Sequence, residues 1–465
     1  MNRQSGRVLL IVRMRSTVPL VAMVLCTLPA PVWAAAFDVA AYGAKGDGTT
    51  VNTAAIQKAI DAAAKAGNGV VVFQPGVYLS GALFLKSRME LRLDEGVEIR
   101  GVQDLAAYPV MQTRVAGVEM PWPSALINVY RQAHVKIGGK GAVDGDGKIW
   151  WDKYWKMRRE EYEPKGLRWA ADYDCQRPRL IQVYQSTDID VQGLTLKRSG
   201  FWTVHICYSE RVTVDGVTIR NNIGGRGPST DGVDIDSSSD VLVAHCDIEC
   251  NDDAICLKAG RDADGLRVNR PAEKIRIYDN TVRGGAAGVT IGSETSGGIR
   301  DVEVKGLTVL SPVPAGILFK SASTRGGTIE NIAISNVNTV GGATPVSITL
   351  NWNPSYSYAK LPEGGLPDLP KGMKEMPNYW KVLTAVVPPE KGMPHFRKIR
   401  ISGLKSTGAQ RAFAVSSYAD SPLVDFEFKD IEIEAKTAGT IANTQGWKME
   451  DMRIKTADGS TVVVK

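Results

Sequence analysis

The sequence predicts an all-β fold, a right-handed parallel β-helix with a capping helix at its N-terminal end. Short apolar segments recur with similar punctuation, and Ile189–Leu196 returns as Val212–Ile219 after 23 residues. Periods of about 20 to 50 residues indicate stacked units that bury each other's apolar faces. Neither helical patterns nor hairpin dipeptides separate the later copies, so a β-helix fits better than a sandwich or a propeller. A leucine-rich repeat is the structural alternative, but its leucine frame is missing.

The segment 1–34 has the pattern of a secretory signal peptide. Arg13 and Arg15 precede a mostly apolar run over 18–31, and small residues follow it. A membrane anchor is the alternative, but the run is too short to span a bilayer and contains prolines. We therefore expect a signal peptide at 1–34, a single β-helix domain at 35–465, and a secreted or periplasmic location.

Charge and cysteine content limit the kinds of partner. Four arginines within the predicted signal contribute most of the net charge of +6, so a broad nucleic-acid surface is not expected. No further segment could span a membrane, and we expect a monomer. Five cysteines follow the signal, and none has CxxC spacing, so they are expected to be small buried residues and not zinc ligands.

One helix is predicted near the start of the mature chain. Thr53 is a candidate cap for a helix over 54–65, where apolar residues recur at helical spacing, and Gly67 can end it. The helix precedes the apolar run Val70–Phe73. Placed beside that run, it would cover the open end of the sheet, where backbone groups are otherwise unpaired.

Two long segments interrupt the repeat. Trp150–Pro178 contains four tryptophans, and Asn351–Phe396 is rich in Pro, Gly, Lys, Tyr and Trp. Long excursions from a rigid scaffold often form the walls of a binding site. The alternative is that they only pack on the outer surface.

The densest set of carboxylates lies between Ser229 and Gly260. Asp231 precedes one strand-like segment, and the pair Asp252 and Asp253 precedes the next, at a spacing close to that of the repeat. In a parallel stack, residues one coil apart lie about 4.8 Å from each other, so the three aspartates can meet on one outer face. Crowded carboxylates suit glycoside hydrolysis, in which one acid keeps its proton and another activates water. Turn capping or calcium binding are the alternatives.

The same residues resemble family 28 of the glycoside hydrolases, the polygalacturonases and their relatives. Ser229–Asp234 (STDGVD) is similar to the family's Asn-Thr-Asp-Gly-x-Asp motif, and Asn251–Lys258 (NDDAICLK) to its paired-aspartate motif. The resemblance implies a pectin-lyase-like β-helix and inverting hydrolysis of galacturonosidic bonds in pectin. It also implies that Asp252 is the general acid and that Asp231 and Asp253 hold the attacking water, with no cofactor or metal.

Two positions depart from the family pattern. Ala287 stands where polygalacturonases have histidine, and Leu318 stands where they have arginine. Family members that act on rhamnogalacturonan are similar to this chain in lacking that histidine and arginine. Both homogalacturonan and rhamnogalacturonan therefore remain candidate substrates. The expected substrate-binding residues are Lys258 and Lys320 for carboxylates, and Glu294 and Arg300 for a chain end.

Other functions remain as alternatives. A calcium-dependent pectate lyase needs a base and bound calcium, and it yields an unsaturated product. A carbohydrate-binding β-helix without activity would tolerate Asp252→Asn. His205 lies in an apolar strand and is expected to be structural.

Overall fold

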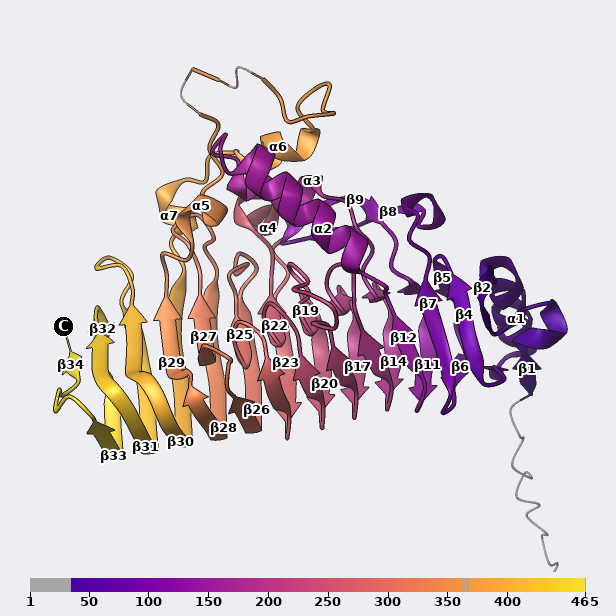
Figure 1. The fold of residues 1–465 in the computed structure, drawn as a ribbon. Coiled ribbons are helices and arrows are strands. Elements are labelled where there is room, and N and C mark those ends of the chain that lie inside the picture. The colour runs from indigo at the N-terminus through magenta and orange to yellow at the C-terminus, as the bar shows by residue number, and fades with distance from the viewer. Residues whose placement is uncertain (1–34, 363, 366–367, 465) are drawn as a thin grey trace, which may run out of the picture. The chain divides into compact units, whose positions relative to one another are not determined.

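The computed structural model describes residues 35–362, 364–365 and 368–464, and the predicted signal peptide lies outside this part. Its strands form a β-helix in which successive coils add parallel strands to three ladders (Figure 1). The predicted fold class is confirmed. No helix of the described residues is long and apolar enough to cross a membrane.

The three ladders run the length of the solenoid, and the long C-terminal strands turn corners and join more than one ladder. The first ladder contains β1 (Ala36–Asp38), β3 (Gly69–Val72), β6 (Met89–Leu93), β11 (Ala133–Gly139), β14 (Thr187–Gln192), β17 (Glu210–Asp215), β20 (Ser239–Ala244), β23 (Ala272–Tyr278), β26 (Ile299–Leu310), β28 (Thr328–Gly342), β30 (His395–Ser416), β31 (Leu423–Ile441) and β33 (Lys448–Thr456). The second begins with β2 (Asp47–Val51), β4 (Gly76–Ser80), β7 (Val97–Gly101), β12 (Ala142–Asp144), β15 (Thr195–Lys197), β18 (Thr218–Arg220), β21 (Asp247–Glu249) and β24 (Thr281–Gly284). The third contains β5 (Leu83–Leu85), β10 (Ile127–Tyr130), β13 (Ile181–Tyr184), β16 (Val204–Cys207), β19 (Val233–Asp236), β22 (Ile255–Lys258), β25 (Val289–Ile291), β27 (Ala315–Lys320), β29 (Thr344–Thr349) and β34 (Val463–Val464), while β32 (Thr444–Gln445) pairs with β31.

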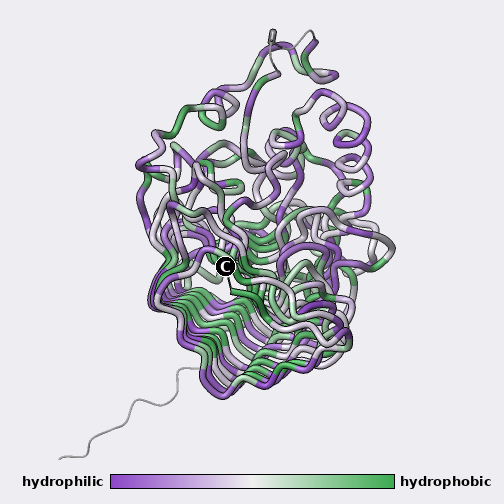
Figure 2. Tube along the Cα trace, turned by 90° about the vertical axis from the view of Figure 1, so that its left-hand side faces the viewer, coloured by the Kyte–Doolittle hydropathy of each residue, from purple (hydrophilic) through white to green (hydrophobic). Residues whose placement is uncertain are grey.

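The core lies inside the coils because the inward residues of each strand stack on equivalents one coil away. Ile189, Val212 and Val241 are Cα partners in successive strands, and all three are buried. Figure 2 looks along the solenoid and shows apolar residues recurring at the same positions of successive coils. The repeat found in the sequence therefore corresponds to structural coils.

Helix α1 (Thr53–Ala66) packs against β3 and β5 at the N-terminal end of the solenoid, as predicted. The predicted role of Thr53 as the cap is wrong. Thr53 is the first helical residue, and its hydroxyl accepts a hydrogen bond from the Gly81 amide at 2.7 Å. The nearby strand end competes for this oxygen, which the local sequence could not indicate.

Both interruptions of the repeat fold above the third ladder (Figure 1). The first contains α2 (Lys148–Met157), the π-helix η3 (Arg158–Tyr162), η4 (Arg168–Ala170) and α3 (Ala171–Asp174); the second contains α5 (Pro354–Ser357), α6 (Asn378–Leu383) and α7 (Pro389–Gly392). An antiparallel hairpin of β8 (Val110–Val115) and β9 (Val118–Pro123) packs against these segments. Trp169 packs edge-to-face on Trp380 with ring centroids 5.1 Å apart. The two segments thus form a second, smaller apolar cluster.

Three short helices complete the described elements. They are η1 (Val39–Tyr42), η2 (Leu105–Ala107) and α4 (Asp262–Val268).

Candidate active site

The solenoid brings the predicted catalytic aspartates together at the start of two neighbouring strands. Asp231 lies two residues before β19, and Asp253 lies two residues before β22. Because Val233 pairs with Ile255, these two aspartates are equivalent positions on successive coils. Carboxylate oxygens of Asp231 and Asp253 lie within 4.8 Å of each other. A water molecule between them would contact both.

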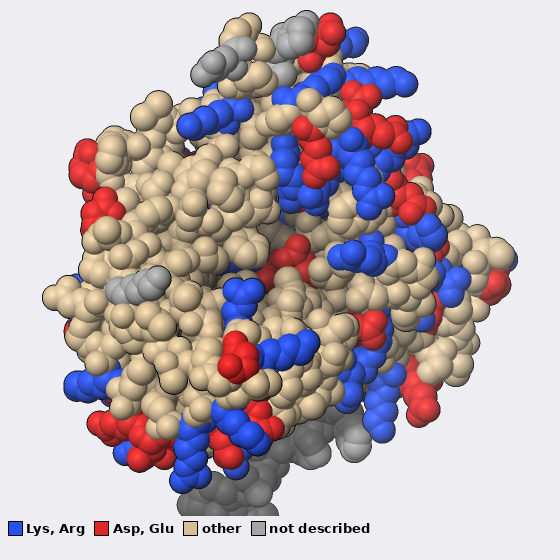
Figure 3. All heavy atoms as spheres, turned by 60° about the vertical axis from the view of Figure 1, so that its left-hand side comes forward, with Lys and Arg blue, Asp and Glu red and all other residues tan. Residues whose placement is uncertain are grey.

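A cleft opens above these carboxylates. Its floor includes Asp231, Asp252 and Asp253, and both interruptions of the repeat contribute to its walls. Figure 3 shows acidic atoms recessed in a hollow, with Lys and Arg atoms on the rim. The long segments therefore form walls of the cleft, as the first of the two alternatives expected.

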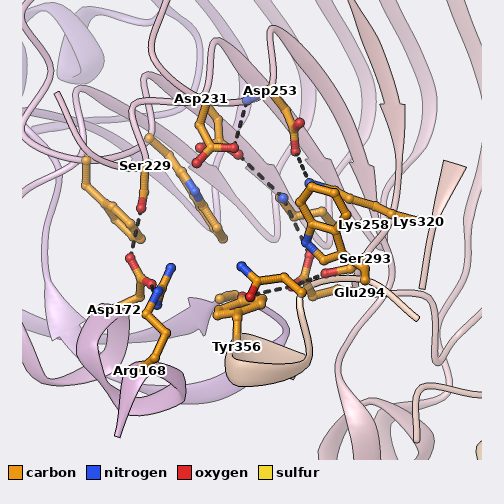
Figure 4. A pocket seen from close by; sticks show the side chains of 16 residues that line it. Arg168, Asp172, Ser229, Asp231, Asp253, Lys258, Ser293, Glu294, Lys320 and Tyr356 are labelled. Atoms are coloured by element: carbon orange, nitrogen blue, oxygen red, sulfur yellow. Dashed lines mark hydrogen bonds and ion pairs between the residues drawn. The ribbon is translucent and has the colours of Figure 1, made fainter. Parts of the chain in front are cut away.

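Two buried lysines neutralise the floor. Lys320 Nζ lies 2.7 Å from Asp253 Oδ2 and 4.6 Å from the centroid of the Trp352 ring. Lys258 Nζ lies 3.5 Å from Asp231, 3.4 Å from Asp234 and 3.5 Å from Glu294. Each ammonium group is thus already engaged with protein carboxylates (Figure 4).

These surroundings separate the pKa values of the paired aspartates. Burial, followed by the charge of Asp253, raises the pKa of Asp252 to about 6. Burial also opposes ionisation of Asp253, but Lys320 and Lys258 outweigh it and hold the pKa of that carboxyl below its usual value. A hydrogen bond of 2.8 Å from the Thr290 hydroxyl adds to this effect. At mildly acidic pH, one neighbour keeps its proton while the other is ionised.

Asp231 and Asp234 crowd around a single ammonium group. Burial, with the charges of Asp234 and Asp252, raises the pKa of Asp231 well above its usual value. Burial raises the pKa of Asp234 to about 7. One lysine cannot fully compensate several buried carboxylates, so Asp231 is the harder of the two facing aspartates to ionise. Asp253, which has Lys320 as a partner, is the ionised member of the Asp231–Asp253 pair.

The wall opposite the floor carries a second charge network. Asp172 accepts hydrogen bonds from Arg168 Nη1 at 2.8 Å, Arg177 Nη2 at 3.1 Å and the Ser229 hydroxyl at 2.8 Å. The Tyr356 hydroxyl donates to Glu294 at 3.0 Å. Figure 4 shows Arg168 and Asp172 across the cleft from Lys258 and Lys320. The Ser229 contact ties this wall to the segment that carries Asp231.

The two positions that depart from the family pattern lie together. Ala287, Ala315 and Leu318 form a small buried cluster against Trp352, which lines the cleft. The positions where the resemblance leads us to expect histidine and arginine are therefore buried next to each other. Of this cluster, only Trp352 lines the cleft.

The predicted site residues divide into two groups. The structure brings Asp231, Asp252, Asp253, Lys258, Lys320 and Glu294 to the cleft. Arg300 does not line it, because Arg300 belongs to β26 in the first ladder and donates to Glu273 at 2.7 Å. Its position in the sequence, shortly after Glu294, did not reveal that the chain turns a corner between them.

Several lining residues were missed from the sequence. Arg168, Asp172 and Tyr356 come from the interruptions, and Trp202 precedes β16. The sequence did indicate that the two interruptions form walls of the site. It could not indicate which of their residues face the cleft, because these segments have no repeat register.

One buried group of potential metal ligands lies below the cleft. Ligand atoms of His205, Cys207 and Asp236 lie within 4.8 Å of one another. Asp236 already pairs with the buried Arg114 at 3.0 Å, and a second cation beside this guanidinium would be repelled. Burial lowers the pKa of His205 to about 4, so it is neutral and packs edge-to-face on Trp202. The group fits a structural role better than metal binding.

Comparison with known proteins agrees with this architecture. The model of "Glycosyl hydrolases family 28" matches residues 70–364, more than half of the chain. A second model, "Rhamnogalacturonase A/epimerase, pectate lyase-like", matches residues 36–93. The fold and the carboxylate cleft define a glycoside hydrolase, an enzyme that cleaves glycosidic bonds. The chain belongs to glycosyl hydrolase family 28.

The chain is similar to several proteins named as enzymes that act on polygalacturonate. A probable polygalacturonase of Vitis vinifera is 29% identical over 63% of this chain and 58% of its own length. An exo-poly-alpha-D-galacturonosidase of Dickeya chrysanthemi is 26% identical over 91% of this chain and 74% of its own. The crystal structure of an exopolygalacturonase from Thermotoga maritima superimposes with a TM-score of 0.73 at 27% identity, covering 90% of this chain and 91% of that one.

Proposed function

We propose that this protein hydrolyses galacturonosidic bonds in pectin by an inverting mechanism and releases galacturonate from chain ends. The observation that carries this proposal is the convergence of Asp231, Asp252 and Asp253 at the floor of one cleft, with opposed pKa values in the adjacent pair. The similarity to polygalacturonases supports pectin as the substrate. The similarity to an exo-poly-alpha-D-galacturonosidase and to an exopolygalacturonase supports exo action.

In the proposed mechanism, Asp252 protonates the leaving oxygen. Its pKa of about 6 lets it keep a proton at acidic pH. Asp253, ionised beside Lys320, draws a proton from the attacking water, and Asp231 holds that water from the neighbouring coil. The water attacks the anomeric carbon as the glycosidic bond breaks, and the configuration inverts.

The deciding experiment is product analysis on homogalacturonan and rhamnogalacturonan oligomers. We expect saturated galacturonate monomers from the first, formed in the presence of a calcium chelator and with inverted configuration by NMR. Asp252→Asn should lower turnover by roughly 10²- to 10⁴-fold. Exposed Asp420→Asn is the matched control and should behave as wild type.

Other products would contradict specific parts of the proposal. Unsaturated, ultraviolet-absorbing products that require calcium would indicate a lyase. A rapid fall in the viscosity of polygalacturonan before monomers accumulate would indicate endo action. Absence of cleavage by a folded protein would favour a carbohydrate-binding role.

Rhamnogalacturonan is the second candidate substrate. Ala287 and Leu318, at the positions where the resemblance leads us to expect histidine and arginine, favour it, because a neutral deoxy sugar needs no charged partner. Cleavage of rhamnogalacturonan oligomers alone would establish this alternative.

We also propose that the protein is exported and acts as a monomer. The signal-like sequence of residues 1–34 supports export. N-terminal sequencing of the exported protein should begin near residue 35, and a retained N-terminus would contradict export by this route. Light scattering should give the mass of one chain, and a dimer mass would contradict the monomer.

A further inference from the structure

A galacturonate in this cleft needs a cationic partner for its carboxylate. The two lysines on the floor are poorly suited, because Lys320 contacts Asp253 at 2.7 Å and Lys258 lies among three carboxylates. Both ammonium groups are held by the carboxylates that they neutralise. Their removal from those contacts would leave buried charges unpaired, which is costly.

Arg168, unlike the two lysines, can bind a further carboxylate without leaving its protein partner. It shares one carboxylate, Asp172, with Arg177, so two guanidinium groups face a single negative charge. Its Nη1 donates to Asp172, while Nη2 has no hydrogen-bond partner among the described residues. Nε is buried and also without a partner there. The network carries an excess positive charge at the wall of the cleft.

The surroundings of Arg168 hold it in place. Its side chain is 14% exposed, and its guanidinium lies 5.2 Å from the centroid of the Tyr356 ring. Asp172 also accepts from Ser229, two residues before Asp231. The guanidinium is therefore fixed relative to the catalytic floor (Figure 4). A fixed, largely buried guanidinium binds a carboxylate more strongly than an exposed one does.

We propose that Arg168 binds the carboxylate of the galacturonate unit seated against this wall and selects acidic over neutral sugars. In this arrangement the first interruption of the repeat supplies the guanidinium that the scaffold lacks at Leu318. Tyr356 and Asp172 are positioning residues, which orient the plane of the guanidinium. This inference rests on the proposed function, because it assumes a galacturonate substrate.

The test compares kcat/KM for galacturonate oligomers and for their methyl esters. Arg168→Gln should lower the value for the acid by roughly 10- to 100-fold, the usual range for loss of a charge-assisted hydrogen bond. The value for the ester should change little, since the ester has no charge to bind. If the wild-type protein does not cleave the ester, its inhibition constant replaces kcat/KM.

Two further variants make the result specific. Arg159→Gln alters an exposed arginine of the same interruption that does not line the cleft, and it should behave as wild type. Arg168→Lys keeps the charge without the planar fork and should lie between wild type and Arg168→Gln. If Arg168→Gln does not fold, as judged by its thermal unfolding, Arg168→Lys decides the question.

Several results would overturn the inference. One is an unchanged kcat/KM for the acid in Arg168→Gln, and another is an equal loss of kcat/KM for acid and ester. If only Arg168→Lys folds, wild-type selectivity between acid and ester in that variant would overturn the inference. Failure of the proposed function is distinguishable, because the wild-type protein would then release no galacturonate.

Discussion

Lys320 forms the shortest ion pair with a proposed catalytic aspartate. It contacts Asp253 at 2.7 Å, and its charge lowers the pKa of both Asp253 and Asp252. An acid that must be protonated and a base that must be ionised give a bell-shaped pH profile. The alkaline limb should fall above about pH 6, where Asp252 loses its proton.

Replacement of Lys320 by methionine should move this profile. Without the ammonium group, the pKa of each aspartate rises, so both limbs shift to higher pH and the maximal rate falls. The measurement is kcat/KM as a function of pH, with exposed Lys405→Met as the control. A lower rate with both limbs unmoved would show that Lys320 does not control these protonation states.

Asp174 connects the two segments that form the walls. It lies at the end of α3 and accepts hydrogen bonds from the Tyr379 hydroxyl and from Trp380 Nε1, both in α6. Burial raises the pKa of Asp174 to about 6, although these hydrogen bonds oppose the shift. The contact between the walls therefore includes a carboxyl group that is costly to ionise.

The attachment of α6 should weaken as pH rises. A carboxyl group with a raised pKa binds its proton more tightly in the folded state, so its stabilising contribution is full below about pH 4 and is lost by about pH 6. Protection of the α6 amides from hydrogen exchange, corrected for intrinsic rates, should fall roughly tenfold or more between pH 4 and pH 7.

Asp174→Asn provides the matched comparison, because the amide cannot ionise. Its α6 protection should be independent of pH over this range, and protection of α1 should be unchanged in both proteins. Equal protection of the wild-type α6 at pH 4 and pH 7 would exclude the proposed effect.

At the scale of the whole molecule, stacked coils pack the core, and the residues that the structure describes contain no disulfide. Five cysteines lie in the described residues, and all are buried and unpaired: Cys175, Cys207, Cys246, Cys250 and Cys256. Burial raises the pKa of each thiol, which disfavours the reactive thiolate. The prediction of small buried cysteines is confirmed.

These five thiols should be unreactive until the protein unfolds. We expect negligible alkylation by iodoacetamide in the native protein, and complete alkylation in denaturant, by peptide mass mapping. A reducing agent should leave Tm unchanged. Fast alkylation of any of the five thiols, or a lower Tm on reduction, would mean that the native state is more open or is cross-linked.

The aspartate floor could be predicted from sequence because the coils repeat. Residue spacing places Asp231 one coil from Asp253, and strand pairing is local in such a fold. The individual residues of the walls could not be predicted in this way. Arg168 and Tyr356 lie in segments without repeat register, and they meet although they are far apart along the chain.

By itself, the sequence determined the class of fold, the hydrolase family and the three aspartates of the floor. The fold class and the spacing of the aspartates follow from the repeat, whereas the family follows from the resemblance of two motifs, Ser229–Asp234 and Asn251–Lys258. Only the tertiary structure decided which carboxylate ionises, that Arg300 lies outside the cleft, and that Arg168 faces it. Those properties depend on burial and on charges brought together from distant segments, and no spacing along the chain encodes them.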